Sequence, residues 1–141
     1  MKTILDTNVV SELRKAHPEP AVVERLRALG SRHLYLTSIT LAELAHGVHR
    51  LDDGRKKTGL LTWLGGIEQR YKGCVLPFDH DAAMLWGQCM ANARKQGQAV
   101  SREDSQIAAI ALRFDLPVMS RDVQPFLAMG VSVANPWQPD A

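Results

Sequence analysis

Several features that mark other classes of protein are scarce or missing in this chain of 141 residues. No apolar run approaches the roughly 20 residues that a membrane-spanning helix needs. Lys2 begins no export signal, because Asp6 interrupts the apolar residues that follow it. Only two cysteines occur, Cys74 and Cys89, and their spacing is that of neither a metal knuckle nor a disulfide framework. These absences argue against membrane and disulfide-rich classes and favour a cytoplasmic protein.

A strong charge of one sign is also missing. The formal net charge of +2 is too small to identify a nucleic-acid-binding protein by charge alone. Local clusters of basic residues are more often solvated helix faces than phosphate contacts. If the chain does bind phosphates, Lys56, Lys57 and Arg94 are the candidates. Charge therefore permits a nucleic-acid substrate and does not require one.

What the sequence does contain is a regular alternation of short apolar runs and amphipathic stretches. The predicted strands are residues 2–5, 34–37, 74–78, 118–120 and 131–133, and the predicted helices are residues 9–15, 21–29, 40–51, 55–71, 81–95 and 101–114. No repeat or linker divides the chain, so residues 1–141 are expected to form a single α/β domain. The order of elements favours a three-layer α/β/α sandwich with a mainly parallel central sheet.

Four acidic residues follow predicted strands or begin predicted helices. Asp6 directly follows the first strand, and Asp122 follows the fourth. Glu43 lies in the first predicted turn after the second strand, and Asp104 in the first turn of residues 101–114. Ligands of such folds bind beyond the carboxyl ends of the strands, where these acids can converge. Several carboxylates in one crevice are the hard oxygen ligands that Mg²⁺ and Mn²⁺ prefer.

Helix capping is a competing interpretation of the same residues. Thr40-x-x-Glu43 and Ser101-x-x-Asp104 have the form of a capping box. Acids in a first helical turn are also favoured by the helix dipole. Asp122 fits ordinary turn chemistry after a strand. Taken singly, each acid is more often a cap than a catalytic group.

The surroundings of the acids favour a site. Asn8 offers an amide that can hold a metal-bound water near Asp6, and Ser120 can orient a neighbouring carboxylate. The helix after Asp104 is almost wholly small and apolar, so it is expected to pack tightly and to hold Asp104 in place.

Five segments in order make the resemblance to a known family specific: ILDTNVVSEL, SITLAELAHGV, EDSQIAAIAL, PVMSRDVQPF and VSVANPW. Together they resemble the PIN-domain ribonucleases, particularly the VapC-type toxins of bacterial toxin–antitoxin pairs and their FitB-like branch. The resemblance spans essentially the whole chain and implies a PIN-like fold. It places the catalytic and metal-binding acids at Asp6, Glu43, Asp104 and Asp122, with Asn8 and Ser120 as polar support. Many relatives carry an acid just before the residue that is Phe126 here, where this chain has Pro125, so Asp122 supplies the fourth acid instead.

The resemblance also implies an activity and partners. It implies a metal-dependent endoribonuclease that uses Mg²⁺ or Mn²⁺ to hydrolyse RNA phosphodiester bonds, as the toxin of a type II toxin–antitoxin system. Transfer or ribosomal RNA is the implied substrate, and the implied protein partners are a cognate antitoxin and a second copy of the chain. DNA is contacted only through the antitoxin, and no membrane is involved.

Two other functions stay open at this point. The first is an aspartate-nucleophile phosphatase of the haloacid-dehalogenase type, in which Asp6 would attack phosphorus. Such enzymes place a second acid two residues later, where this chain has Asn8. The second is a catalytically silent binding module whose acids only cap helices.

Weaker patterns lie elsewhere in the chain. His46 and His49 are three residues apart, but no third ligand lies near them in the sequence, so exposed histidines are expected rather than a zinc site. Arg121 fits a phosphate contact and an ion pair with an acid equally well. Four carboxylates without metal repel one another, so metal affinity is expected to fall as the pH drops.

Overall fold

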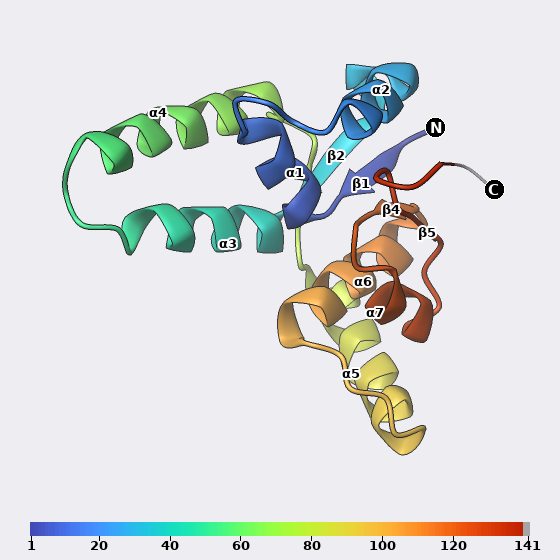
Figure 1. Cartoon of the computed structure of the whole chain (residues 1–141). Helices are drawn as coiled ribbons and strands as arrows, with labels where there is room; N and C mark the ends of the chain where they lie inside the picture. The colour runs from blue at the N-terminus through green and yellow to red at the C-terminus, as the bar shows by residue number, and fades with distance from the viewer. Residues whose placement is uncertain (140–141) are drawn as a thin grey trace.

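A five-stranded parallel sheet forms the centre of the computed structural model, which describes residues 1–139 (Figure 1). The strands are β1 (Thr3–Leu5), β2 (Leu34–Thr37), β3 (Val75–Leu76), β4 (Val118–Met119) and β5 (Val133–Ala134). Their order in the sheet is β3-β2-β1-β4-β5, and every neighbouring pair is parallel. All the carboxyl ends therefore lie at one edge, and the strand order changes direction between β1 and β4, where ligands of such sheets bind.

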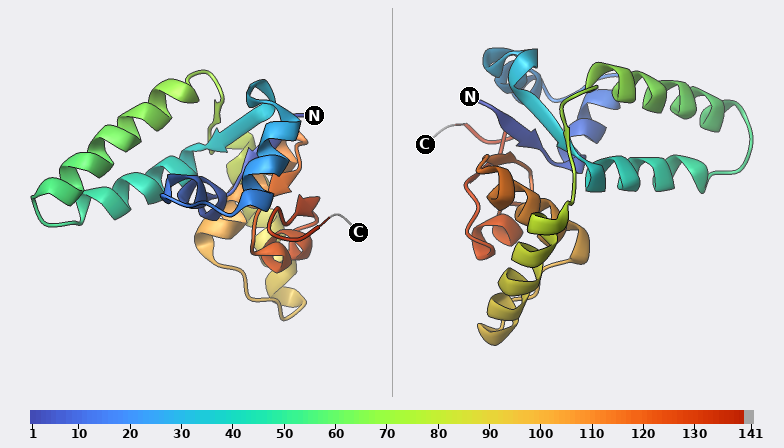
Figure 2. Two further views of the ribbon diagram at one scale, coloured as in Figure 1. Left: turned by 45° about the horizontal axis from the view of Figure 1, so that its top comes forward. Right: turned by 180° about the vertical axis from the view of Figure 1, so that it is seen from behind.

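Helices cover both faces of this sheet (Figures 1 and 2). They are α1 (Thr7–Arg14), α2 (Pro20–Leu29), α3 (Ser38–His49), α4 (Arg55–Arg70), α5 (His80–Lys95), α6 (Arg102–Phe114) and α7 (Val123–Ala128), with a 3-10 turn η1 (Ser31–His33) before β2.

The side chains of β1 divide between two hydrophobic clusters. Leu5 packs with residues of α1, α2, α3 and α4, whereas Ile4 packs with residues of α5, α6 and α7. The same alternation occurs in β4, where Met119 belongs to the first cluster and Val118 to the second. Because successive strand residues point to opposite faces, these two clusters are the two sides of one sheet. The predicted three-layer α/β/α sandwich is confirmed.

The predicted elements are confirmed with shifted ends, and one helix was missed. Helix α1 begins at Thr7 rather than at residue 9, because Asp6 already caps it. The predicted strands at 74–78 and 131–133 are shorter or displaced by a residue or two. Helix α7 was not predicted because it has only six residues and contains Pro125. Proline is tolerated there, in the first turn, where its missing N–H group has no helical partner to lose.

Helices α3 and α4 form a hairpin that projects sideways from the sheet (Figures 1 and 2). Leu44 of α3 and Leu64 of α4 join the cluster that covers β1 and β2. The Arg14 guanidinium lies 5.9 Å from the centre of a Trp63 ring and so ties α1 to α4. No helix within residues 1–139 is long and apolar enough to cross a membrane.

Candidate active site

Asp6 stands at the carboxyl end of the central strand. Ile4 and Leu5 are fully buried on opposite faces of the sheet, and the Asp6 N–H group donates to the Met119 carbonyl at 3.0 Å. The backbone thus delivers the Asp6 side chain to the crevice between β1 and β4, where only 3% of the residue is exposed. One carboxylate oxygen accepts from the Thr7 N–H group at 2.8 Å and caps α1. Asp6 therefore caps a helix and also faces the crevice.

The hydroxyl of Ser120 connects Asp6 to two neighbouring segments. It donates to the second Asp6 carboxylate oxygen at 2.6 Å. It also accepts from the Asn8 side-chain amide at 3.2 Å and from the Asp122 N–H group at 3.0 Å. The Asn8 side-chain oxygen in turn accepts from the Arg121 N–H group at 3.3 Å. A hydroxyl has one proton and two lone pairs, so these three bonds use all of its capacity. The structure confirms that Asn8 and Ser120 lie beside Asp6.

Burial raises the pKa of Asp6 from its ordinary value of 3.8 to about 6. The hydrogen bonds from Ser120 and Thr7 oppose this rise, because they stabilise the charged form. The negative charges of Asp104 and Glu43 reinforce it. A buried carboxylate with like-charged neighbours is an electrostatic cost for the fold, which a bound cation relieves.

Glu43 is held from α3, and its position corrects one prediction. The N-cap of α3 is Thr37, whose hydroxyl accepts from the Thr40 N–H group at 3.2 Å. The predicted capping box with Thr40 as its cap is therefore wrong, and Glu43 lies one turn further into the helix than predicted. The error arose because Thr37 ends a strand, so the sequence pattern assigned it to β2 alone. Glu43 does not cap α3.

A chain of threonine hydroxyls leads to Glu43 instead. The Thr7 hydroxyl donates to a Glu43 carboxylate oxygen at 2.8 Å and lies 3.0 Å from the Thr40 hydroxyl. Since Thr7 has a single hydroxyl proton and an ionised Glu43 can only accept, Thr40 donates to Thr7 in that state. Burial raises the pKa of Glu43, the charges of Glu103 and Asp104 add to the rise, and the Thr7 bond opposes it.

Asp104 and Asp122 approach the same place from α6 and α7. Ser101 caps α6 by accepting from the Asp104 N–H group at 3.1 Å, as the sequence predicted. Burial raises the pKa of Asp104, the Ser101 hydroxyl opposes the rise, and the charges of Asp122 and Glu103 reinforce it. Asp122 precedes α7 but makes no side-chain capping bond there. Capping thus accounts for neither Glu43 nor Asp122.

The charges of neighbouring acids raise the pKa values of three of the four predicted acids. Asp104 and Glu43 act on Asp6, Asp104 acts on Glu43, and Asp122 acts on Asp104. As the side chains stand, no group of three acidic, histidine or cysteine side chains within residues 1–139 is arranged to hold a metal ion. The donor set itself, all carboxylate oxygens with one nearly buried member, suits a hard divalent cation.

Two residues of this site were not predicted. Thr7 bonds to Glu43 across 36 positions of sequence, which no local pattern indicates. The charge of the exposed Glu103 side chain raises the pKa of both Glu43 and Asp104. Its place next to Asp104 was the available signal, but the capping box drew attention to Asp104 alone.

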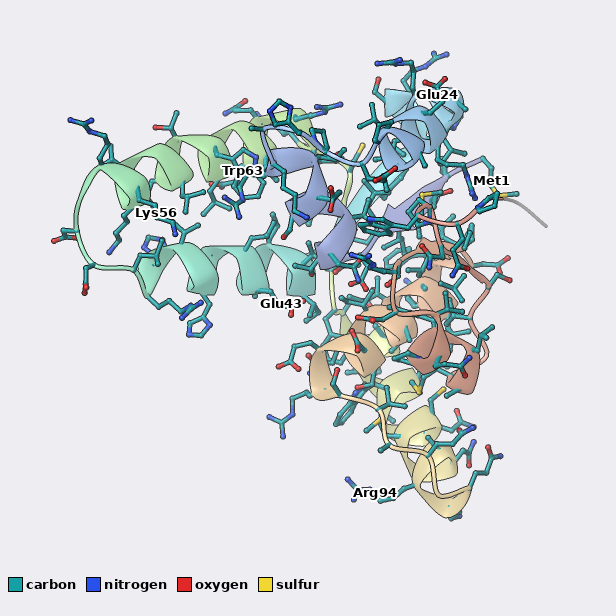
Figure 3. All side chains as sticks on the ribbon, viewed as in Figure 1. Met1, Glu24, Glu43, Lys56, Trp63 and Arg94 are labelled. Carbon is teal, nitrogen blue, oxygen red and sulfur yellow. The ribbon has the colours of Figure 1, made fainter. Side chains whose placement is uncertain are left out.

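Other singled-out residues lie away from the acids. Lys57 donates to the His49 carbonyl at 3.2 Å and to Asp53 at 3.3 Å, inside the α3–α4 turn. Figure 3 shows Lys56 at the far end of the same hairpin, away from Glu43. His46 and His49 are exposed on the last turn of α3. Within residues 1–139 no third side chain joins them in a group that could hold a metal ion.

Arg121 and the two cysteines were also singled out in the sequence. The Arg121 guanidinium lies 4.9 Å from the centre of a Trp137 ring, and within residues 1–139 no carboxylate forms an ion pair with it. Cys74 and Cys89 are free and half-buried. Neither feature adds a group to the acidic crevice.

Comparison with known proteins gives a consistent result. The sequence profile of the PIN domain matches residues 3–130. The chain is 40% identical to the VapC ribonuclease Y4jK of Sinorhizobium fredii over 137 residues, which cover 96% of this chain and 98% of that protein. It is 39% identical to the toxin FitB of Neisseria gonorrhoeae over 135 residues, 95% of this chain and 97% of that one.

A solved structure of FitAB bound to the IR36 DNA fragment superimposes with a TM-score of 0.92 at 36% identity, covering 99% of this chain and 98% of that one. The matched profile and relatives of this length show the family that the sequence motifs indicated. The chain belongs to the PIN-domain family.

Proposed function

We propose that this protein is a divalent-metal-dependent endoribonuclease and the toxin of a type II toxin–antitoxin pair. One observation carries the proposal. Four carboxylates from four separate segments gather beyond the carboxyl ends of the central strands, where Asp6 is almost fully buried, and two of them, Glu43 and Asp122, cap no helix. The names of the relatives, a VapC ribonuclease and a toxin, support the same activity.

Asp6 and Asp104 are the proposed principal ligands of Mg²⁺ or Mn²⁺, with Glu43 and Asp122 completing the site directly or through water. These residues would hold the cation, which would supply Lewis-acid chemistry for hydrolysis of the phosphodiester bond. The protein's own residues supply the positioning. Ser120 fixes the direction of the Asp6 carboxylate, and Thr7 fixes that of Glu43.

The alternatives fit the geometry less well. Asn8 occupies the position of the second acid of an aspartate-nucleophile phosphatase, and its amide is already bonded to Ser120 and to the Arg121 backbone. A silent module would have no need for Asp6 to be buried beside other carboxylates, because an exposed residue caps a helix as well.

For partners, we propose transfer or ribosomal RNA as substrate, a cognate antitoxin as inhibitor, and a second copy of the chain as a dimer partner. The FitAB structure, which contains a relative of this chain, is of a complex bound to a DNA fragment. For this chain we propose that DNA is contacted only through the antitoxin. Sequencing of RNA ends after induction of the protein in cells identifies the RNA and the cleavage site.

The direct test compares the wild type with Asp6→Asn and Asp104→Asn for Mn²⁺-dependent cleavage of RNA. The wild type is expected to cleave and both variants to lose cleavage, while Asp52→Asn, an exposed acid in the α3–α4 turn, retains it. Circular dichroism must show that each variant is folded, because Asp6 also caps α1. A wild type that cleaves no RNA, or acid variants that cleave as well as it does, would contradict the proposal. Asp6-dependent release of phosphate from a phosphomonoester would favour the phosphatase.

A further inference from the structure

A hollow of about 430 Å³ lies between α5 and the segment that leads into α6. Trp86, Met90, Arg94, Val100 and Arg102 line it. An adjoining hollow of about 530 Å³ shares Met90, Arg94 and Val100 with it, so the two form one depression. Sites for small organic ligands have volumes of roughly 300 to 1,000 Å³, so the space accommodates a nucleotide.

The aromatic wall of this hollow is rigid. The Trp86 indole N–H group donates to the Ser105 hydroxyl at 2.8 Å. Ser105 is fully buried, and its hydroxyl donates to the Arg102 carbonyl at 2.7 Å. The Trp86 ring is thereby held in one orientation by the first turns of α6. An aromatic ring held in this way serves as a stacking platform for a nucleic-acid base.

Two arginine side chains flank the ring. Arg94 and Arg102 are both exposed, and within residues 1–139 neither forms an ion pair or stacks on an aromatic ring. Arg113, also on α6, is by contrast engaged with Asp79 and Asp81. Two guanidinium groups of this kind beside an apolar and aromatic surface complement a phosphate and the base attached to it.

The hollow and the acidic crevice both border the first turns of α6. Ser105, which anchors Trp86, directly follows Asp104, so the ring and the carboxylate are fixed by the same helical turn. The Arg102 and Asp104 side chains leave the first turn on different sides of the helix, since two residues correspond to about 200° of rotation. A helix with its side chains is about 10 Å across. An RNA strand that passes over the N-terminal end of α6 therefore extends from the acids toward the hollow.

We propose that this hollow binds a nucleotide of the single-stranded RNA substrate outside the acidic crevice, with Trp86 stacking on the base and Arg94 and Arg102 holding phosphates. The inference rests on the proposed ribonuclease function and adds to it a substrate-binding site. The sequence suggested Lys56, Lys57 and Arg94 as phosphate-binding residues. The proposed site contains Arg94 and Arg102 but neither lysine.

The first test removes the two charges in the double variant Arg94→Gln/Arg102→Gln. Binding of a fluorescent single-stranded RNA of about 12 nucleotides is measured by anisotropy in EDTA over a range of salt concentrations. Affinity is expected to fall about tenfold or more, and the slope of log affinity against log salt to decrease by about 1.4, because each lost phosphate contact on a single strand contributes about 0.7. In Mn²⁺, KM for RNA cleavage is expected to rise more than kcat falls.

A matched control removes the same charge elsewhere. Arg32 and Lys72 are exposed just before β2 and β3, at the opposite edge of the sheet from the acids. Arg32→Gln/Lys72→Gln is expected to leave the affinity within about twofold and the slope near that of the wild type. Equal losses in the two double variants would overturn the proposal, because they would show only general electrostatic attraction.

The second test concerns the ring. Trp86→Leu is expected to weaken RNA binding by about tenfold, within the range for loss of one base stack, while the salt slope is unchanged. Trp86→Phe keeps a ring and is expected to retain most of the affinity, although it loses the bond to Ser105. If both Trp86 variants are folded and bind RNA as the wild type does, the stacking role is wrong.

Failure of this proposal can be told apart from failure of the proposed function. If the wild type neither binds nor cleaves RNA, the ribonuclease function itself is wrong. If the wild type cleaves RNA and Arg94→Gln/Arg102→Gln is unaltered in RNA binding, only the hollow is wrongly assigned.

Discussion

The two halves of the acidic crevice differ in how firmly they are held. Asp6 is almost fully buried, and both of its carboxylate oxygens accept short hydrogen bonds from neighbouring groups. Asp104 is half-buried and Asp122 is exposed, and both lie at helix starts on the other side of the crevice. The difference divides the crevice into a fixed half around Asp6 and a more exposed half around Asp104 and Asp122.

The largest expected difference between the halves is in catalysis. Asp6→Asn is expected to lower the rate of Mn²⁺-dependent RNA cleavage by roughly 100- to 1,000-fold, whereas Asp122→Asn lowers it by about tenfold. The reason is that an exposed ligand can be replaced by water, while a buried one cannot. Initial rates at saturating Mn²⁺ measure both effects. Losses of similar size in the two variants would remove the distinction between the halves.

The fixed half is also expected to control how stability depends on pH. The pKa of Asp6 in the folded protein, about 6, lies above its ordinary value of 3.8. The folded state therefore binds the proton more tightly, so this contribution to stability is present below about pH 4 and is lost as the pH rises through 6. A rise of this size corresponds to about 3 kcal/mol at most.

Chemical denaturation in EDTA at pH 5 and pH 8 measures this dependence. The Asp6→Asn variant is expected to lose less stability than the wild type between these two pH values. The raised pKa values of Glu43 and Asp104 act in the same direction in both proteins, so the comparison isolates Asp6. If the free energy of unfolding changes between pH 5 and pH 8 by the same amount in the variant and in the wild type, then ionisation of Asp6 does not destabilise the fold.

Removal of the central hydroxyl is expected to loosen the fixed half. Ser120→Ala deprives Asp6 of a hydrogen-bond donor, leaves the Asp122 N–H group without its side-chain acceptor, and leaves the Asn8 amide only its longer bond of 3.5 Å to Asp6. A loss of about 1–3 kcal/mol in the free energy of unfolding is expected, measured by urea denaturation at pH 8. Ser132→Ala, at an exposed position, is the control and is expected to stay within about 0.5 kcal/mol of the wild type. Equal stability of the two variants would show that the Ser120 bonds contribute little.

The smallest expected effect concerns Glu43. Thr7→Val keeps the shape of the side chain but removes the hydroxyl that bonds to Glu43. Titration calorimetry is expected to show Mn²⁺ affinity reduced by a few-fold, in keeping with about 0.5–1.5 kcal/mol for one hydrogen bond. Thr7→Ser retains the hydroxyl and is expected to restore the affinity. Equal affinities for the valine and serine variants would mean that Thr7 does not position Glu43.

The sequence predicted what depends on neighbouring residues and missed what depends on contacts between distant ones. Ile4 and Leu5 followed by Asp6 predicted both a strand and a side chain at its end, because burial and chain direction determine them together. Thr37 was missed as a cap because a strand-forming residue can also end the strand and begin the next helix. The bond from Thr7 to Glu43 joins residues 36 positions apart, and no local pattern indicates it. The sequence did suggest Ser120 as a support for a carboxylate, but the fold was needed to show that its partner is Asp6, 114 positions away. The anchoring of Trp86 by Ser105 is of the same kind.

The division of Ile4 and Leu5 between the two faces of the sheet has a consequence for how the chain tolerates insertions and deletions. A single-residue deletion within β1 would exchange the faces to which these side chains point and would draw Asp6 back by one strand residue, about 3.3 Å. Folding and the acidic crevice would then be damaged by the same event. A deletion of one residue in the exposed turn between α3 and α4 has no such coupling. The number of residues in β1 is therefore constrained both by the packing of Ile4 and Leu5 and by the position of Asp6.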